Sequence, residues 1–342
     1  MAKPVRVVLV GCGGISNGWW NAVKDNADVK IVGLVDLNEE QAKTRQGEWG
    51  LANAVVGTDL ATVLAEVAPD AVFDCTVPPA HVHVTLTALA HGCHVMGEKP
   101  LADSMDNARK MVAAAKQAGL IYSVIQNRRY MSSIRSLRSY LDTEKIGPIT
   151  TVNSDFYIGA HFGGFRDVMD HVLLLDMAIH SFDQARLITG ADPVSVYCHE
   201  WNPEGSWYKH GASAIAIFEM TGGIVYTYRG SWCAEGLNTT WECNWRVQGQ
   251  TGCATWNGGD EFAAQFRSGD EGFFRPQTDD TITVTDEPQT SGGHAGVIGE
   301  FIRCVQTGGT PETVCTDNIK SLAMVFGAIE SAKTGQKVQI TI

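Results

Sequence analysis

The sequence predicts an α/β protein in which a doubly wound parallel sheet is followed by an α+β domain with a large, mostly antiparallel sheet. Three observations predict this fold. Short apolar strands alternate with helical patterns as far as Ile125, and a glycine-rich turn joins the first strand to the first helix. Longer strands with alternating apolar and polar residues follow Gly147 and Pro148, as expected where one face of a sheet is covered.

The glycine-rich turn follows an apolar strand at Val5–Val10 and reads Gly11-Cys12-Gly13-Gly14-Ile15-Ser16. Gly11 permits the tight turn, and Gly13 lets the backbone approach a pyrophosphate at the helix N-terminus. Ser16 stands where the third glycine of this Rossmann fingerprint usually lies. Because a strand precedes the motif and a helical pattern follows it, the motif predicts a dinucleotide site.

The next strand, Val29–Val35, ends in an acidic residue, Asp36. Its carboxylate stands about twenty residues beyond the glycines, where it would accept hydrogen bonds from the adenosine ribose hydroxyls. No arginine occurs in Leu37–Glu39 to bind a 2′-phosphate, so NAD is favoured over NADP. As an alternative, Asp36 caps the helix that follows.

The remaining elements are expected in two domains, residues 1–122 and 123–342. In the first, helices are expected near 38–49, 58–67, 78–91 and 105–118, and strands near 54–56, 71–76, 93–96 and 121–125. In the second, strands are expected near 149–158, 194–201, 212–220, 224–232, 241–248 and 337–342, and helices up to 141, over 170–183, 296–306 and 318–334. The glycine-rich segment 257–280 is expected to be an extended loop.

A Glu98-Lys99-Pro100 sequence directly follows the predicted strand at 93–96. Pro100 biases Lys99 towards extended geometry, so the lysine is held at the carboxyl end of a strand. In an open α/β sheet, ligands bind at that edge. On composition alone, a surface charge is the plainer explanation of such a lysine.

The predicted helix Asp170–Asp183 is apolar on every side in its first turns, which indicates that it is buried there. Asp176 and His180 are four residues apart and share one face of the helix. Imidazole is the usual general base near neutral pH, and a neighbouring carboxylate fixes its orientation. Alternatively, Asp176, His180, Asp183 and Gln184 form the solvated stripe of an amphipathic helix.

Aromatic residues and a nearby loop have both a functional and a packing interpretation. His161, Phe162, Phe165 and Arg166 lie on a glycine-rich loop suited to covering a substrate, or they only connect two elements. Aromatic side chains also crowd the second domain, where they would stack on sugar rings or, more plainly, pack the sheet or a subunit interface. These are Trp201, Trp207, Tyr208, Trp232, Trp241, Trp245 and Trp256, while Trp19 and Trp20 follow the glycine turn and would cover a nicotinamide or simply pack.

Composition narrows the classes of function. The 26 basic and 38 acidic residues give a net charge of -12, which argues against nucleic acid or an anionic membrane as a partner. No apolar run approaches the about 18 residues of a transmembrane helix, and the early first strand leaves no room for a signal peptide. The nine cysteines include no Cys-x-x-Cys pair, so we expect reduced thiols in the cytoplasm and no metal site.

These residues together resemble the Gfo/Idh/MocA oxidoreductase family, which includes glucose–fructose oxidoreductase and inositol dehydrogenase. The resemblance covers essentially the whole chain and follows the family's order: the Gly11–Ile15 turn, the proline-rich turn with His81, Glu98-Lys99-Pro100, Arg129, and the Asp176-x-x-x-His180 pair. Many folds share the glycine turn, whereas the combination of Glu-Lys-Pro with Asp-x-x-x-His is specific.

The resemblance implies hydride exchange between a nicotinamide and a hydroxyl carbon of a sugar or cyclitol. It implies that Lys99 hydrogen-bonds the reacting oxygen, that His180 takes the hydroxyl proton and that Asp176 orients the site. With the contacts inferred above, the cofactor site would comprise Gly11, Gly13, Gly14, Ile15, Asp36, Thr76, His81, Glu98, Lys99 and Arg129. Substrate contacts would come from Lys99, Tyr130, His161, Arg166, Asp176 and His180.

The resemblance also implies an open sheet in the C-terminal domain that supplies substrate contacts and a homodimer or homotetramer interface. Two features depart from the family pattern and bear on the substrate loop rather than on the cofactor. Bulky Val172, Leu173 and Leu174 stand where the family often has glycines, and Met131 stands where a proline is commoner.

The leading hypothesis is therefore an NAD-dependent sugar or cyclitol dehydrogenase. Glycoside cleavage by transient oxidation, with tightly held NAD, is an alternative that would use the same Lys99 and His180. A non-catalytic NAD-responsive regulator is a third hypothesis. Such a protein need not keep the catalytic trio, and this chain retains Lys99, Asp176 and His180.

Overall fold

The computed structural model describes residues 3–287 and 291–342, which fall into two compact units. The first unit runs to Tyr130 and takes up the chain again as far as Leu322, and the second comprises Met131–Glu287 and Ala323–Ile342. These units differ from the expected ranges 1–122 and 123–342 because a late segment returns to the first unit. Within that unit, the Val124 amide donates to the Thr313 carbonyl oxygen at 3.0 Å.

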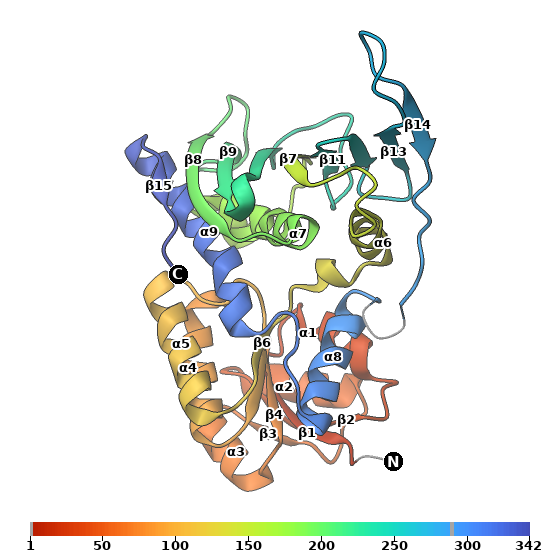
Figure 1. Cartoon of the computed structure of the whole chain (residues 1–342). Coiled ribbons are helices and arrows are strands. Elements are labelled where there is room, and N and C mark those ends of the chain that lie inside the picture. The colour runs from red at the N-terminus through yellow and green to blue at the C-terminus, as the bar shows by residue number, and fades with distance from the viewer. Residues whose placement is uncertain (1–2, 288–290) are drawn as a thin grey trace. The chain divides into compact units, whose positions relative to one another are not determined.

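The first unit is built on a parallel sheet of six strands in the order β3-β2-β1-β4-β5-β6 (Figure 1). Because the strand order reverses between β1 and β4, the carboxyl ends of these two strands form the switch point where such sheets bind ligands. The strands are β1 (Val5–Val10), β2 (Val29–Val35), β3 (Val55–Gly57), β4 (Ala71–Asp74), β5 (His94–Gly97) and β6 (Tyr122–Val124).

Helices cover both faces of this sheet (Figure 1). On one face, Phe73 of β4 lies between Trp19 and Phe301, with ring centroids 5.0 and 6.3 Å apart, so a helix from late in the chain completes the early core. The helices are α1 (Ser16–Val23), α2 (Glu39–Glu48), α3 (Leu60–Val67), α4 (Pro78–Ala90), α5 (Met105–Ala118), the 3-10 turn η1 (Asn127–Tyr130) and α8 (His294–Thr307).

The second unit contains a nine-stranded sheet in the order β14-β13-β12-β11-β7-β10-β9-β8-β15, in which only β7 and β10 pair in parallel. This confirms the predicted fold class. The strands are β7 (Ile149–Tyr157), β8 (Pro193–Trp201), β9 (Ser213–Met220), β10 (Val225–Ser231), β11 (Asn244–Gly249), β12 (Gly252–Trp256), β13 (Phe262–Arg267), β14 (Gln277–Asp280) and β15 (Val338–Gln339).

Helix α7 (Ile179–Thr189) packs on one face of this sheet, where Phe182 contacts Phe218 and Tyr228 at centroid distances of 4.8 and 5.3 Å. The unit also contains α6 (Ser132–Leu141), the 3-10 turns η2 (Gly164–Val168) and η4 (Thr221–Gly223), and the π-helical turn η3 (Leu173–Ala178). Helix α9 (Cys315–Thr334) contributes residues to both units. The outer face of the sheet exposes apolar side chains, among them Tyr197, Ile215 and Ile217.

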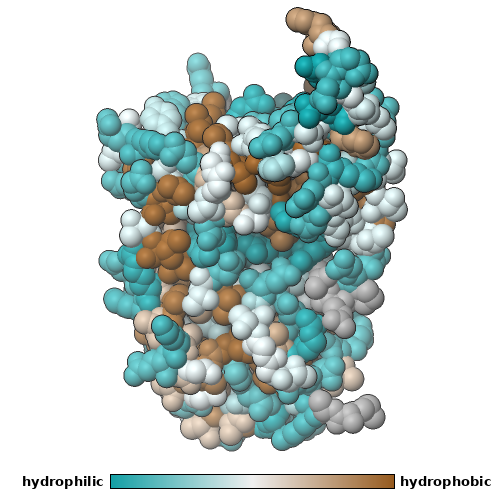
Figure 2. All heavy atoms as spheres, viewed as in Figure 1, coloured by the Kyte–Doolittle hydropathy of each residue, from teal (hydrophilic) through white to brown (hydrophobic). Residues whose placement is uncertain are grey.

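Two expectations about the end of this sheet are wrong. The segment 257–280 is not an extended loop, because it contains β13 and β14, which pair as an antiparallel hairpin. The hairpin projects from the sheet, and its tip carries the exposed Phe273 and Phe274 (Figures 1 and 2). The last strand, expected over 337–342, is reduced to the two residues of β15.

Candidate functional site

The glycine turn after β1 has the close backbone approach that its sequence predicts. Gly11 has φ of +87°, and a Cβ there would lie 2.8 Å from the carbonyl carbon and oxygen of Cys75 and 2.9 Å from the Thr76 nitrogen. Only glycine fits at this position, because the backbone of Cys75 and Thr76 leaves no room for a Cβ. The Ser16 hydroxyl donates to the Gly13 carbonyl oxygen at 2.6 Å and closes the turn. Ile15 is exposed on it.

The Asp36 carboxylate, just after β2, holds this turn through hydrogen bonds to backbone amides. One carboxylate oxygen accepts the Cys12 amide at 2.7 Å, and the other accepts the Asn38 amide at 2.8 Å. The N-cap of α2 is Asn38, whose side chain accepts from Glu40, so the alternative reading of Asp36 as the helix cap is wrong. Each carboxylate oxygen can accept more than one hydrogen bond, which leaves capacity for ribose hydroxyls.

Helix α2 adds contacts to the same turn that sequence reasoning missed. Arg45 Nε and Gln41 Nε2 both donate to the Cys12 carbonyl oxygen, at 3.1 and 3.0 Å. Burial, with the nearby Asp36 carboxylate, raises the pKa of the Cys12 thiol to about 12, so the thiol is neutral and serves the packing. No local pattern marks Arg45, which lies thirty-three residues beyond the atom it contacts.

His81 joins two loops at the carboxyl edge of the sheet. Its Nε2 lies 3.0 Å from the Thr76 carbonyl oxygen and its Nδ1 lies 3.0 Å from the Pro100 carbonyl oxygen. The ring is fully buried, so it links the proline-rich turn to the Glu98-Lys99-Pro100 segment. Thr76 is held in turn by Asp74, which accepts its hydroxyl at 2.5 Å and its amide at 3.0 Å.

The Glu98-Lys99-Pro100 segment follows β5 as predicted, and its glutamate is the anchor. Glu98 is buried and accepts the indole N–H of Trp19 at 2.7 Å and the Lys99 amide at 3.1 Å. The Lys99–Pro100 peptide bond is cis and the Lys99 side chain is half-buried. Trp19 therefore orients the lysine segment from α1, whereas Trp20 stacks on Trp49 at 5.2 Å.

His294, at the start of α8, lies beside the same carboxylate. Burial lowers its pKa, and the charge of Glu98 opposes that shift. Its Nδ1 lies 3.1 Å from the side-chain nitrogen Nδ2 of Asn127. Arg129 and Tyr130, which the sequence predicts to contact ligands, form side-chain contacts with other residues of the first unit. Arg129 pairs with Asp317 at 3.3 Å, and the buried Tyr130 donates its hydroxyl to Glu300.

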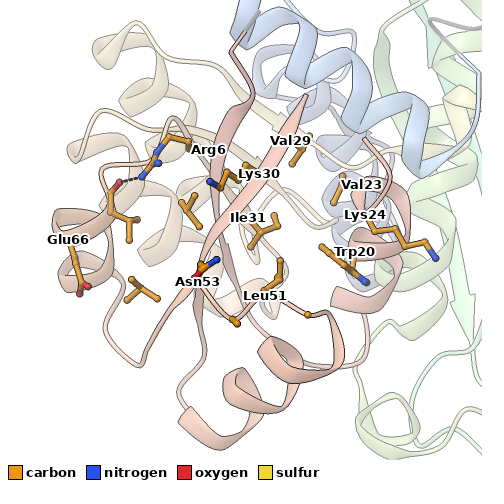
Figure 3. Close-up of a pocket in the computed structure, with 16 residues that line it drawn as sticks. Arg6, Trp20, Val23, Lys24, Val29, Lys30, Ile31, Leu51, Asn53 and Glu66 are labelled. Atoms are coloured by element: carbon orange, nitrogen blue, oxygen red, sulfur yellow. Dashed lines mark hydrogen bonds between the residues drawn. The ribbon is translucent and has the colours of Figure 1, made fainter. Parts of the chain in front are cut away.

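A separate hollow in the first unit lies away from the glycine turn. Figure 3 shows it at the amino-terminal ends of β1 and β2, with Arg6, Val29, Lys30 and Trp20 in its wall and a volume of about 520 Å³. The Arg6 guanidinium donates to the Val67 carbonyl oxygen at 2.6 Å. This hollow is at the opposite end of the strands from the glycine turn, so it is no part of the dinucleotide site.

In the second unit, the polar residues of the Asp-x-x-x-His helix are all buried. Asp176 and His180 expose 8% and 7% of their surface, and Asp183 and Gln184 even less. The alternative of a solvated stripe is therefore wrong. Gln184 donates to Glu242 at 2.7 Å. Asp176 lies in the π-helical turn η3, a feature that no residue pattern predicted and that is frequent at functional sites.

Arg166 and His161 lie on the loop before this helix. Arg166 Nε donates to the Asp176 carboxylate at 2.6 Å, so the structure brings these two predicted residues together. His161 Nε2 lies 3.1 Å from Glu235, and its ring stacks on Trp207 with a centroid distance of 3.7 Å. Within the described ranges, no group of three or more His, Cys, Asp or Glu side chains is arranged to hold a metal ion.

Comparison with known families matches both parts of the chain. Residues 5–126 match the model of an oxidoreductase family with an NAD-binding Rossmann fold, and residues 134–255 match the GFO/IDH/MocA C-terminal domain. The chain belongs to the Gfo/Idh/MocA oxidoreductase family. The predicted resemblance is thus confirmed, and the chain is an enzyme of the oxidoreductase class.

Individual relatives cover nearly the whole chain. An uncharacterised protein of Sinorhizobium fredii is 30% identical over 98% of this chain and 95% of its own length. Inositol 2-dehydrogenase of Rhizobium meliloti is 24% identical over 99% of both chains. The crystal structure of an Agrobacterium radiobacter oxidoreductase in complex with NAD+, L-tartaric acid and magnesium shares the fold, with a TM-score of 0.88 at 21% identity over 99% of both chains.

The residues of the first unit fit the dinucleotide that this family binds. A Cβ at Gly13 or Gly14 would meet no described atom within 4 Å, so the turn leaves open space before the N-terminus of α1. Backbone N–H groups at a helix N-terminus attract a pyrophosphate. Gly11 and Asp36 hold the turn in that shape.

Among the residues that the structure describes, no helix is long and apolar enough to cross a membrane.

Proposed function

We propose that this Gfo/Idh/MocA enzyme is an NAD-dependent dehydrogenase that oxidises a secondary hydroxyl of a sugar, sugar derivative or cyclitol. The observation that carries the proposal is the burial of Asp176 and His180 on one helix, with the Asp176 carboxylate held by Arg166. A buried imidazole beside a fixed carboxylate is suited to general-base work. The relationship to inositol 2-dehydrogenase supports the substrate class.

In this proposal, His180 removes the hydroxyl proton while Asp176 orients the site. Lys99 donates a hydrogen bond to the reacting oxygen, where a positive charge stabilises the developing alkoxide. Bound NAD would supply the hydride-accepting chemistry that this oxidation requires. Glu98 and Trp19 restrict the backbone that carries Lys99, which keeps the lysine in place without further reorganisation.

We infer a preference for NAD over NADP. Asp36 is held at the carboxyl end of β2, and Glu39 and Glu40 begin α2 directly after it. A 2′-phosphate there would meet these carboxylates. Both basic residues of α2 already have partners. Lys43 pairs with Glu39 and Glu40 at 3.0 Å, and Arg45 donates to the Cys12 carbonyl oxygen and pairs with Glu48 at 2.5 Å. The ratio of kcat/KM for NAD and NADP tests this preference.

We also propose that the enzyme works in the cytoplasm and as a homodimer or homotetramer through the outer face of the nine-stranded sheet. All nine cysteines are free, as is usual for proteins of a reducing compartment. The exposed Tyr197, Ile215 and Ile217 on β8 and β9 form an apolar area suited to a subunit interface. Light scattering on the Ile215→Glu and Ile217→Glu variants tests the assembly, since an unchanged mass would exclude this face.

The central experiment follows nicotinamide absorbance with NAD and a panel of inositols, aldoses, anhydrosugars and glycosides. Reduction of NAD by one member would establish the dehydrogenase and its substrate class. Lys99→Ala and His180→Asn should then lose turnover while NAD still binds, and the exposed Lys110→Ala should behave as the wild type. Unchanged turnover in Lys99→Ala would exclude this mechanism.

Other outcomes of the panel favour the competing functions. Release of an aglycone without net reduction of NAD would indicate glycoside cleavage by transient oxidation. NAD binding without turnover of any compound would indicate a regulator.

A further inference from the structure

Three exposed aromatic side chains gather beside the helix that carries Asp176 and His180. Phe162, Phe165 and Trp241 expose 54%, 63% and 43% of their surface. The Phe162 and Trp241 rings lie 6.1 Å apart between centroids. We call these three residues the aromatic patch. So much exposed aromatic surface in one place typically marks a binding site.

The aromatic patch rests on a rigid base. Phe162 packs edge-on against the buried Trp232 at 6.0 Å, and the buried Phe156 contacts both Trp232 and Trp241, at 6.3 and 6.4 Å. Aromatic pairs at these distances stabilise one another beyond the area that they bury. Two of the three exposed rings, Phe162 and Trp241, are therefore held in place before any ligand arrives.

The backbone of the loop is held as well. Gly159 forms a β-bridge with Cys233, and a Cβ at Gly159 would lie 2.8 Å from the Ala234 carbonyl oxygen. The Tyr208 hydroxyl donates to the Ala160 carbonyl oxygen at 3.1 Å. These contacts place the loop against the connection that follows β10, so its position is built into the unit.

Arg166 connects the aromatic patch to the proposed catalytic helix. Its guanidinium carbon lies 5.1 Å from the Phe162 ring centroid and 4.7 Å from that of Phe165, and its Nε donates to Asp176 at 2.6 Å. Only the Arg166 side chain therefore separates a molecule that reacts beside Asp176 from the faces of Phe162 and Phe165. The patch is within reach of a second ring on the substrate.

The charge of this loop disfavours a phosphate-bearing group. Arg166 is the only lysine or arginine in the segment 158–170, and Asp176 already neutralises it. Asp167 and Asp170 add negative charge, although Asp170 lies 3.2 Å from His210 Nε2. At the edge of the patch, His161 and Glu235 form a pair that can exchange hydrogen bonds with hydroxyl groups. Aromatic faces with a few polar groups at their rim are the usual lining of a small-molecule site.

We propose that the aromatic patch is a subsite for a neutral ring attached to the reacting sugar, so that the preferred substrate is a glycoside rather than a free monosaccharide or a sugar phosphate. This inference rests on the proposed dehydrogenase function and adds the substrate class. The attached ring is either a second sugar or an aromatic aglycone, since both present flat or C–H-rich faces for stacking.

The test uses calorimetry to measure the dissociation constants of methyl and phenyl β-glycosides of glucose and galactose. The protein is the full chain saturated with NAD. One stacked ring stabilises binding enough for the phenyl glycoside to bind about fivefold to tenfold more tightly than the methyl glycoside. Phe162→Ala and Trp241→Ala should each bring that ratio close to one. Cellobiose in place of the phenyl compound tests whether a sugar ring serves as well.

The control is Phe273→Ala, which removes a still more exposed phenylalanine (96%) between β13 and β14 and should keep the ratio. Circular dichroism verifies that each variant is folded. A ratio near one in the wild type, a ratio unchanged in both patch variants, or no binding of any glycoside would overturn the subsite. If the ratio behaves as expected but no glycoside reduces NAD, the subsite stands and the proposed oxidation fails.

Discussion

Removing the guanidinium of Arg166 should destabilise the second unit by about 2 kcal/mol. Its Nε lies 2.6 Å from the Asp176 carboxylate, and the Asp176 side chain exposes only 11% of its surface. A hydrogen bond to a charged group is worth about 1.5–3 kcal/mol, and stripping a fully buried charge of its partner costs about 3–5 kcal/mol. Because the Arg166 side chain is 29% exposed, water can partly replace it, which places the loss near the lower range.

The variant to measure is Arg166→Met, since methionine keeps the length of the side chain and its packing on Phe162 and Phe165. In a domain of this size, each kcal/mol shifts Tm by about 2–4 °C, so calorimetry should record a fall of about 4–8 °C. The matched control is Arg229→Met. Arg229 pairs with Asp155 through two bonds of 2.6 and 2.7 Å, but on an exposed surface where such pairs contribute at most about 1 kcal/mol.

The two variants lose the same chemical group. They differ in the burial of the carboxylate, and Arg166 also lies over the Phe162 and Phe165 rings, whose packing the methionine keeps. A fall in Tm for Arg166→Met that is no larger than that for Arg229→Met would refute the reasoning. It would mean that solvent or the other groups around Asp176 hold its charge well enough once Arg166 is removed.

Three further predictions concern the first unit. Gly11→Ala should lower both Tm and the affinity for NAD, because its Cβ would lie 2.8 Å from the backbone of Cys75. The control Gly18→Ala has open space around its Cβ on a helix and should leave Tm unchanged or raised. Equal Tm values for the two variants would contradict this. Burial lowers the pKa of His294 below its ordinary 6.5, so the folded protein resists its protonation and loses stability as the pH falls below 6.5. Tm of His294→Gln, measured by calorimetry on lowering the pH from 6.5, should fall less than that of the wild type, and an equal fall would exclude this residue as a cause. Burial raises the pKa of Cys12 to about 12, so a thiol reagent at neutral pH should label Cys12 only when the protein unfolds. Mass spectrometry measures the labelling rate of each cysteine. Labelling of Cys12 as fast as that of the less buried Cys233 would contradict this prediction.

The fold could be predicted because its signals are local. Glycines, β-branched runs and a proline mark β1, the turn at Gly11 and the segment at Pro100, and each depends on neighbours in sequence. The missed strand β14 carries no such signal, since Gln277–Asp280 is polar and largely exposed at the edge of the sheet. Hydrogen bonds to a partner strand define it, and these cannot be read from one segment.

The sequence predicts candidate residues for the site but not their partners. Motifs single out Lys99, Asp176 and His180, yet Trp19, which orients the segment of Lys99, lies 79 residues away from the glutamate it contacts. The local pattern is compatible with either a solvated or a buried helix around His180. Its burial depends on distant pairs such as Gln184 with Glu242, since polar groups enter a core only with partners.

The late return of the chain has a consequence for biosynthesis. The first sheet leaves the ribosome early, but α8, which covers Phe73 with Phe301, is separated from it by more than two hundred residues. Tyr130 likewise waits for Glu300, its partner 170 residues later. Contacts so distant in sequence form slowly and leave apolar surface uncovered in the meantime. The nucleotide-binding half can therefore mature only after synthesis has passed α8, and a nascent chain stalled before that helix would expose the unfinished core to chaperones.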